Sequence, residues 1–145
     1  MIRELKPDNI RYIIVHCSDS PSGRGDNART IHRWHTGRAR DPFDCIGYHK
    51  VILENGTVEV GRQEYMRGAH AGPDYNWRSL GVCLIGRDGF TSAQYRALWG
   101  VLKDWKSRYD IQKVVGHRDV NPSKTCPNFD VAEFCDNPEP WTMDY

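Results

Sequence analysis

Two near-continuous apolar segments constrain the fold of this chain more than any other feature. Residues 10–16 read IRYIIVH and residues 80–86 read LGVCLIG. Uninterrupted apolar runs of this length are typical of central strands that are covered on both faces. Turn-forming residues bound the first run, from Pro7 to Asn9 and from Ser18 to Gly23. The sequence therefore predicts a sheet built around buried central strands.

The periodicity of the other segments predicts an α/β fold. Asn55-Gly56, between two β-prone segments, is the preferred two-residue turn of a β-hairpin. Thr91 and Gln94 form a capping-box pattern that opens a long helix. We expect strands at about 10–16, 46–53, 57–60, 80–86 and 111–115, and helices at about 27–37, 91–109 and 128–135. The chain is therefore expected to form a single domain over residues 1–145, with a central mixed β-sheet flanked by helices.

The helical and strand periodicities also predict which side chains face the core and which face a site. The long helix carries one apolar stripe that is expected to face the core, made of Tyr95, Leu98, Leu102, Trp105 and Tyr109. Trp34, in the helix before it, is also expected to pack in the core. Strict alternation along the second strand places Tyr48 and Lys50 on one face of the sheet and His49 on the other. Tyr48 is therefore a candidate for a polar group that faces a site.

Composition and charge argue for a folded domain and against a general nucleic-acid-binding protein. The chain has 145 residues, of which 39% are hydrophobic and 27% charged, and these values suit one folded domain with its own core. The net charge is only +1, so nucleic acid is not an expected partner. Residues 1–40 carry eight Lys and Arg against four acids, whereas residues 129–145 carry five acids and no Lys or Arg. The basic end could favour an anionic surface such as a bacterial wall, although an ordinary solvated face is the simpler interpretation.

No segment predicts export or membrane insertion. No apolar run approaches the length of a membrane-spanning helix, and the N-terminus has no apolar segment ahead of a cleavage site, so no signal peptide is expected. The five cysteines are odd in number and irregular in spacing, which argues against a complete disulfide framework. We therefore expect synthesis in a reducing compartment, with at least one cysteine used as a thiol.

Two histidines stand at the ends of predicted strands. His16 closes the first strand, and His117 follows the last one and opens the segment GHRDVNPSKTCPNFD at 116–130. If these strands are neighbours, both imidazoles emerge at the same rim of the sheet. The loop stiffened by two prolines would return Cys126 to that rim as a third ligand. Two imidazoles and a thiolate with one open position form the catalytic type of zinc site. An ordinary loop beside satisfied core histidines is the alternative.

Two other candidate ligand sets are weaker. His32 and His35 are three residues apart on a predicted helix, but no carboxylate or thiol accompanies them. Cys17 is adjacent to His16, and successive residues of a strand point to opposite faces, so Cys17 is expected to point away from the site. A closed structural zinc site is therefore not expected.

Several motifs in a fixed order connect the chain with a known family. They are VHCS at 15–18, WH at 34–35, GYH at 47–49, NGTVEVGR at 55–62, GAHA at 68–71, NWRSLGVCLIG at 76–86, GH at 116–117 and PSKTCPNFD at 122–130. The chain resembles the zinc-dependent N-acetylmuramoyl-L-alanine amidases, especially the small single-domain amidase lysozymes of short-tailed phages. The peptidoglycan recognition proteins share the fold of that family, a central mixed sheet flanked by helices.

The resemblance implies a mechanism and a site. One zinc ion would be held by His16, His117 and Cys126, Tyr48 and Lys124 would be catalytic, and His70 would line the substrate groove. The implied reaction is hydrolysis of the amide bond between N-acetylmuramic acid and L-alanine in bacterial peptidoglycan. Zinc would activate water and polarise the carbonyl, and Lys124 would stabilise the oxyanion. No well-placed Glu is evident as a general base.

The resemblance also implies a biological setting. A phage endolysin would be made in the host cytoplasm and would reach the cell wall after another protein permeabilises the membrane. We expect a monomer with no membrane or nucleic-acid partner. Two alternatives remain: a module that binds peptidoglycan without cleaving it, although such relatives typically lack the zinc cysteine, and an amidase that also binds and inhibits a phage RNA polymerase. The segments 19–26 and 37–45 give no alignment with the family.

Overall fold

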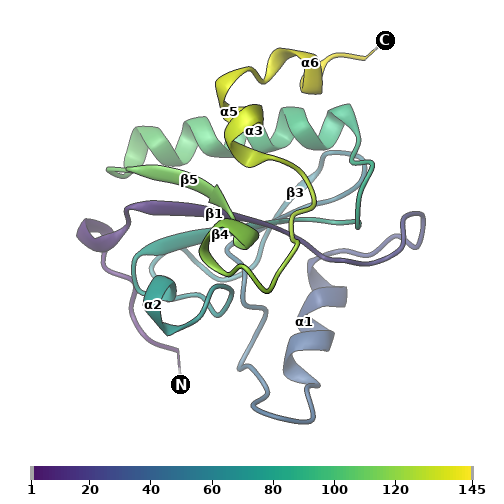
Figure 1. Ribbon diagram of the computed structural model, residues 1–145. Helices are drawn as coiled ribbons and strands as arrows, with labels where there is room; N and C mark the ends of the chain where they lie inside the picture. Colours follow the sequence, from purple (N-terminus) through teal and green to yellow (C-terminus); the bar gives the residue numbers. More distant parts are fainter. Residues whose placement is uncertain (1, 145) are drawn as a thin grey trace.

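The computed structural model describes residues 2–144 and contains one mixed β-sheet (Figure 1). Its five strands lie in the order β3-β2-β4-β1-β5. Their bounds are β1 Tyr12–Cys17, β2 Lys50–Ile52, β3 Val58–Val60, β4 Ser79–Leu84 and β5 Lys113–Gly116. Strand β1 pairs in parallel with β4 and β5, β2 pairs in parallel with β4, and β3 runs antiparallel to β2. The two apolar runs are therefore adjacent inner strands, as predicted.

Helices cover both faces of this sheet (Figure 1). They are the 3-10 turn η1 Pro7–Asn9, α1 Ala28–Thr36, α2 Pro73–Asn76, α3 Ser92–Arg108, α4 His117–Val120, α5 Val131–Asp136 and α6 Glu139–Thr142. Helices α3, α5 and α6 lie on one side of the sheet and α1 lies on the other. The three longest agree with the predicted helices, whereas α2, α4 and α6 were not predicted. None of the helices within residues 2–144 is long and apolar enough to cross a membrane.

The larger hydrophobic core lies between the sheet and α3. Alternate residues of β1 and β4, such as Val15 and Val82, point to this side and are completely buried. Leu98, Leu102 and Trp105 of the predicted stripe are buried against them, with Tyr95 and Tyr109 at the edges. The capping box at the start of α3 is present as predicted, because the Thr91 side chain accepts a hydrogen bond from the Gln94 backbone. The apolar stripe is therefore core.

The smaller core lies on the opposite face, under α1. Ile31 packs there with Ile46, Val51, Cys83 and Ile85, and Tyr48 packs against this group. Trp34, which was expected in the core, is instead 40% exposed. Helix α1 contributes only Ile31 to the fully buried set. Because only one side of α1 faces the small core, the opposite side of the helix is exposed to solvent.

The hairpin of β2 and β3 differs from the prediction in the length of its strands and in the length of its loop. The strands are only three residues long, and the Leu53 N–H bonds to the Thr57 carbonyl across a three-residue loop. Gly56 occupies the left-handed position of that loop, with φ of 88°, as in a hairpin with a G1 bulge. The expected sharing of one face by Tyr48 and Lys50 is wrong, because the Lys50 ammonium lies 5.3 Å from the Trp105 ring on the α3 side. Residues 46–49 do not form a regular strand, so simple alternation fails there.

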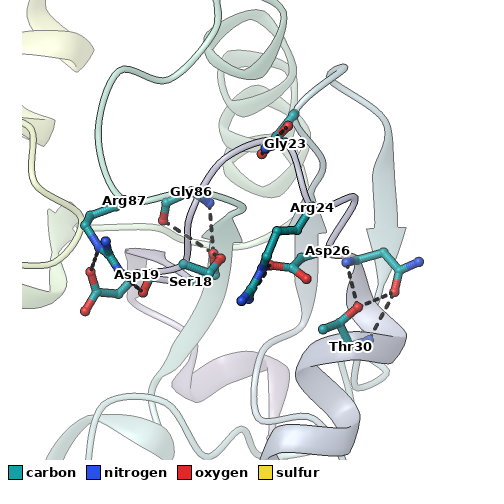
Figure 2. A network of polar contacts seen from close by, with 11 residues as sticks. Ser18, Asp19, Gly23, Arg24, Asp26, Thr30, Gly86 and Arg87 are labelled. Carbon is teal, nitrogen blue, oxygen red and sulfur yellow. Dashed lines mark hydrogen bonds and ion pairs between the residues drawn. The ribbon is translucent and has the colours of Figure 1, made fainter.

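The segment that joins β1 to α1 is fastened at several points (Figure 2). The Gly86 N–H donates to the Ser18 hydroxyl over 2.8 Å, and Arg87 bonds to the Asp19 carboxylate over 2.9 Å. Further along, the Gly23 N–H donates to the Glu54 carboxylate over 2.9 Å. These contacts fix where α1 begins relative to the sheet.

Candidate functional site

The ligand atoms of His16, His117 and Cys126 all lie within 4.8 Å of one another. Strand register brings the two histidines together. Because β1 and β5 are parallel and Val15 pairs with Gly116, the next residue on each chain is a histidine. Their ring centroids are 4.5 Å apart. The predicted meeting of His16 and His117 at one rim is therefore confirmed in geometry.

Backbone hydrogen bonds hold the loop that carries Cys126. The Arg118 N–H, in the short helix α4, donates to the Cys126 carbonyl over 2.8 Å. The Cys17 N–H donates to the Cys126 sulfur over 3.0 Å. The Cys126 thiol also lies 3.8 Å from the Cys17 carbonyl, so the backbone of Cys17 adjoins this loop. Cys17 itself stays outside the three-residue group.

His70 is joined to His16 by a directed chain of hydrogen bonds. The Ser79 hydroxyl donates to the Tyr75 carbonyl over 2.7 Å, so its oxygen is left to accept from the Nε2 of His70, 3.2 Å away. With its proton on Nε2, His70 accepts at Nδ1. The Nε2 of His16 lies 2.8 Å from that Nδ1 and must be the donor. The lone pair of His16 is therefore on Nδ1, where a metal can bind it.

Small residues make room for the His70 ring. A Cβ atom on Gly81 would lie 2.7 Å from the Nδ1 of His70, and one on Gly68 would lie 2.6 Å from its Cδ2. Both distances are too short for a side chain to coexist with the ring in this position. Gly81 in β4 and Gly68, the first residue of GAHA, therefore leave the space that the His70 ring occupies. The Asn76 side chain fixes the same loop by accepting the His70 N–H over 3.1 Å.

The two histidines of α1 position the segment that precedes Tyr48. The Ile46 N–H donates to the Nδ1 of His32 over 3.2 Å, and the Gly47 N–H donates to the Nδ1 of His35 over 2.9 Å. His35 also packs against the Tyr48 ring, with centroids 5.5 Å apart. The two histidines, three residues apart on α1, thus hold the backbone in place rather than a metal. Sequence reasoning missed this role, although the WH motif contains His35.

Burial sets the protonation of the site. Burial, and then the neighbouring His70, lower the pKa of His16 well below its ordinary value. Burial lowers the pKa of His70 in the same way, and burial with the Lys124 charge lowers that of His117. A hydrogen bond with Cys17, and then burial, raise the pKa of Cys126. The imidazoles are neutral at neutral pH, the form that binds metal, and the thiol must lose its proton when a metal binds.

Burial also raises the pKa of Tyr48 well above its ordinary value. Its hydroxyl is therefore protonated at neutral pH, which suits a hydrogen-bond donor. The Tyr48 and His16 ring centroids are 4.9 Å apart, so this donor stands beside the three-residue group.

An open cleft of about 570 Å³ lies over the group. Its lining includes four residues expected from the sequence, which are Tyr48, His70, His117 and Lys124. It also includes His35, Arg38, Phe43 and Asn76, which sequence reasoning had not assigned to a site. The motifs containing His35 and Asn76 were the available signals for those two. Arg38 and Phe43 lie in the segment 37–45, which gave no alignment.

The donor set fits zinc. Imidazole nitrogen and cysteine sulfur are preferred zinc ligands, and three protein ligands leave the fourth tetrahedral position open. Within residues 2–144 no fourth His, Cys, Asp or Glu completes this group. The group could therefore hold a metal ion in an arrangement that gives a substrate access from the cleft.

A family model and several known proteins match most of this chain. The family model for N-acetylmuramoyl-L-alanine amidase matches residues 6–129. Endolysins of Klebsiella phage KP32 and Escherichia phage T7 are both 36% identical to this chain. They align with 99% and 91% of the chain, and with 97% and 89% of their own lengths.

Solved structures show the same fold. The N-acetylmuramoyl-L-alanine amidase LysC from Clostridium intestinale has a TM-score of 0.79 and 26% identity, covering 94% of this chain and 93% of that one. Drosophila PGRP-LB, a peptidoglycan recognition protein, has a TM-score of 0.79 and 25% identity, covering 95% and 86%. The chain belongs to the N-acetylmuramoyl-L-alanine amidase family.

Proposed function

We propose that this protein is a zinc-dependent hydrolase that cleaves the amide bond between N-acetylmuramic acid and L-alanine in peptidoglycan. The observation that carries the proposal is the convergence of His16, His117 and Cys126 within 4.8 Å, beneath a cleft that Tyr48 and Lys124 line. Membership of the family supports the proposed amide bond and peptidoglycan as the substrate. The convergence of the three residues supports their proposed role as zinc ligands. The three converging residues would hold one zinc ion.

Each polar group of the cleft has a role in this reaction. Zinc, when bound, supplies Lewis-acid polarisation of the carbonyl and a more acidic water. Lys124 offers a positive charge to the oxygen on which negative charge develops. The protonated hydroxyl of Tyr48 donates a hydrogen bond at the same place. His70 holds the ring of His16 through the contact described above.

The cleft lining contains no Asp or Glu among the described residues. These lining residues therefore offer no carboxylate as a general base, and proton transfer would rely on imidazole or water.

The alternative of a module that only binds peptidoglycan is less well supported. Such a module needs a cleft but no converging metal ligands. Here Cys126 completes the group, and backbone hydrogen bonds from Cys17 and Arg118 hold it in place. Lysis of a host cell, a monomeric state and binding to a phage RNA polymerase stay predictions.

The decisive experiment incubates the purified protein with peptidoglycan and measures newly exposed N-terminal alanine before chelation, after chelation and after zinc is restored. We expect alanine amino groups to appear with zinc and to stop appearing with the chelator. Release of reducing sugar ends would place the cleavage at a glycosidic bond instead. Sedimentation with the wall without any cleavage would favour the binding module.

A matched pair of cysteine variants tests the ligand set. We expect Cys126→Ser to lose most of its zinc binding and its activity. Cys135→Ser makes the same chemical change in α5, outside the three-residue group, and should keep both. Equal zinc content in the two variants would remove Cys126 from the proposed site.

A further inference from the structure

Positive charge is concentrated in one short part of the chain. Residues 24–40 contain five arginines and one aspartate, a net of +4, although the whole chain carries only +1. The one aspartate, Asp26, pairs with Arg24 over 2.8 Å (Figure 2). The other four arginines, in what we term the basic segment (residues 28–40), are exposed: Arg29, Arg33, Arg38 and Arg40. The rest of the protein is therefore net negative.

The basic segment is not neutralised by the protein itself. Within residues 2–144 the guanidinium groups of Arg29, Arg33 and Arg40 have no ion pair or hydrogen bond. Arg29 and Arg33 are four residues apart on α1, where like charges repel. Helix α1 has no acid of its own in its first turn, and the Glu59 carboxylate accepts the Ala28 N–H at that end over 2.9 Å. The repulsion between Arg29 and Arg33 would be relieved by an anionic partner.

The basic segment borders the cleft. His35 of α1 and Arg38, just beyond the helix, both line the cleft, and the Arg38 guanidinium lies 4.4 Å from the centre of the Phe43 ring. Trp34 is 40% exposed on the same helix. The basic segment therefore adjoins the cleft through His35 and Arg38.

One group of acidic residues lies on the opposite side of the sheet. Asp130, Glu133, Asp136 and Glu139 belong to or flank α5 and α6, which pack with α3 on the face away from α1 (Figure 1). This acidic group is thus separated from the basic segment by the sheet. Such a distribution orients a protein as it approaches a charged surface.

We propose that the basic segment is a docking surface for the anionic stem peptides of peptidoglycan, placed so that the wall meets the open side of the cleft. This inference rests on the proposed function. Stem peptides carry free carboxylates, and arginine binds carboxylates through two parallel hydrogen bonds. The surface would hold neighbouring stem peptides of the polymer while the cleft acts on one of them.

The test compares two charge-neutralising variants of the complete, zinc-loaded protein. Arg29→Gln/Arg33→Gln removes two charges from α1, and Lys103→Gln/Lys106→Gln removes two exposed charges from α3 on the other side. The rate of alanine release is measured against the concentration of insoluble peptidoglycan at low and high salt. Sedimentation with the wall is measured in parallel. Turnover of a soluble N-acetylmuramoyl-tripeptide reports on the cleft alone.

We expect the α1 variant to need about fivefold more insoluble wall for half-maximal rate at low salt, since each exposed ion pair contributes modestly. Its maximal rate on the soluble substrate should equal that of the unmodified protein. The α3 variant should match the unmodified protein in both assays. At about 1 M salt, where the screening length is about 3 Å, the difference should disappear.

Other outcomes would overturn the inference. Equal weakening in both variants would mean that only net charge matters, and no weakening in either would mean that the wall does not dock there. If the α1 variant keeps its wall binding but loses adsorption to phosphatidylglycerol vesicles, the partner is a membrane. Absence of alanine release by the unmodified protein from either substrate would instead sink the proposed function, and sedimentation would still report on docking.

Discussion

The Nε2 atom of His16 and the Nδ1 atom of His70 lie 2.8 Å apart, and both rings are buried. Because Ser79 accepts from the other nitrogen of His70, this contact places the proton of His16 on Nε2. His70 therefore orients the His16 ring of the three-residue group, and it also lines the cleft. The resemblance alone implied only a role in the substrate groove.

We expect His70→Ala to weaken zinc binding by about 10- to 100-fold, because partners that orient a metal-binding histidine have effects of this size. Competition with a chromophoric chelator measures the affinity. Nitrogen NMR of the metal-free protein should find the His16 proton on Nε2, and should find it redistributed in the variant. As a control, Tyr65→Ala alters an exposed ring outside the site and should leave zinc affinity unchanged. Unchanged affinity in His70→Ala would contradict the supporting role.

We expect Lys124→Ala to keep zinc and lose turnover by about 100-fold or more, as when an oxyanion-stabilising group is removed from other enzymes. Lys124 lines the cleft but is not one of the three converging residues. Metal analysis and single-turnover rates on a soluble substrate separate the two effects. Lys103→Ala, on the exposed side of α3, is the matched control. Normal turnover in Lys124→Ala would remove this residue from the mechanism.

Glu64 fastens the C-terminal end of α3, and its variant should lower stability. Its carboxylate accepts hydrogen bonds from Arg108 and Tyr109, each over 2.6 Å, and from the Trp105 indole over 3.0 Å. Burial alone would raise the pKa of Glu64, but these hydrogen bonds lower it to about 2. We expect Glu64→Gln to lower the free energy of unfolding by about 2 kcal/mol at neutral pH, because the bonds are charge-assisted.

The pH dependence of this effect has a definite sign. The native pKa of Glu64 lies below the ordinary value of 4.5, so the unfolded chain takes up the proton first. The stabilisation is complete above pH 4.5 and is lost as the pH falls towards 2. Urea unfolding of both proteins across this range should show the gap closing. Glu139→Gln, at an exposed position of α6, should show no gap at any pH.

His49 should make the fold sensitive to mild acid. It is buried, accepts the Gly81 N–H at Nδ1 over 3.1 Å and donates from Nε2 to the Met66 carbonyl over 2.7 Å. Burial lowers the pKa of His49 from 6.5 to about 4, so protonation favours the unfolded chain. Stability should therefore fall as the pH drops from 6.5 to about 4, by up to about 3 kcal/mol for this group.

NMR titration measures this directly. The ring protons of His49 should titrate with a midpoint near pH 4 in the folded protein. A midpoint above pH 6 would show that the ring charges without unfolding, and the predicted acid sensitivity would then have another source.

Local patterns in the sequence determined the elements of this protein. Apolar runs fixed β1 and β4, a capping box fixed the start of α3, and the stripe of α3 fixed the face that is buried, because these features depend on neighbours within one or two turns of chain. Motif order determined the family. The three converging residues were named in advance through the family resemblance, and His16 and His117 stood out because each lies at the end of a predicted strand.

Tertiary structure decided how these parts meet. The register of β1 with β5 places His16 beside His117, and the fold around Gly81 places His70 against His16. Because the backbone at 46–49 is irregular, Lys50 and Tyr48 lie on different sides of the sheet. An alternation rule does not predict this arrangement. Hydrogen-bond direction and burial depend on residues far apart in the chain. Such relationships exist only once the sheet has formed, so the sequence could supply the chemical groups but not their arrangement.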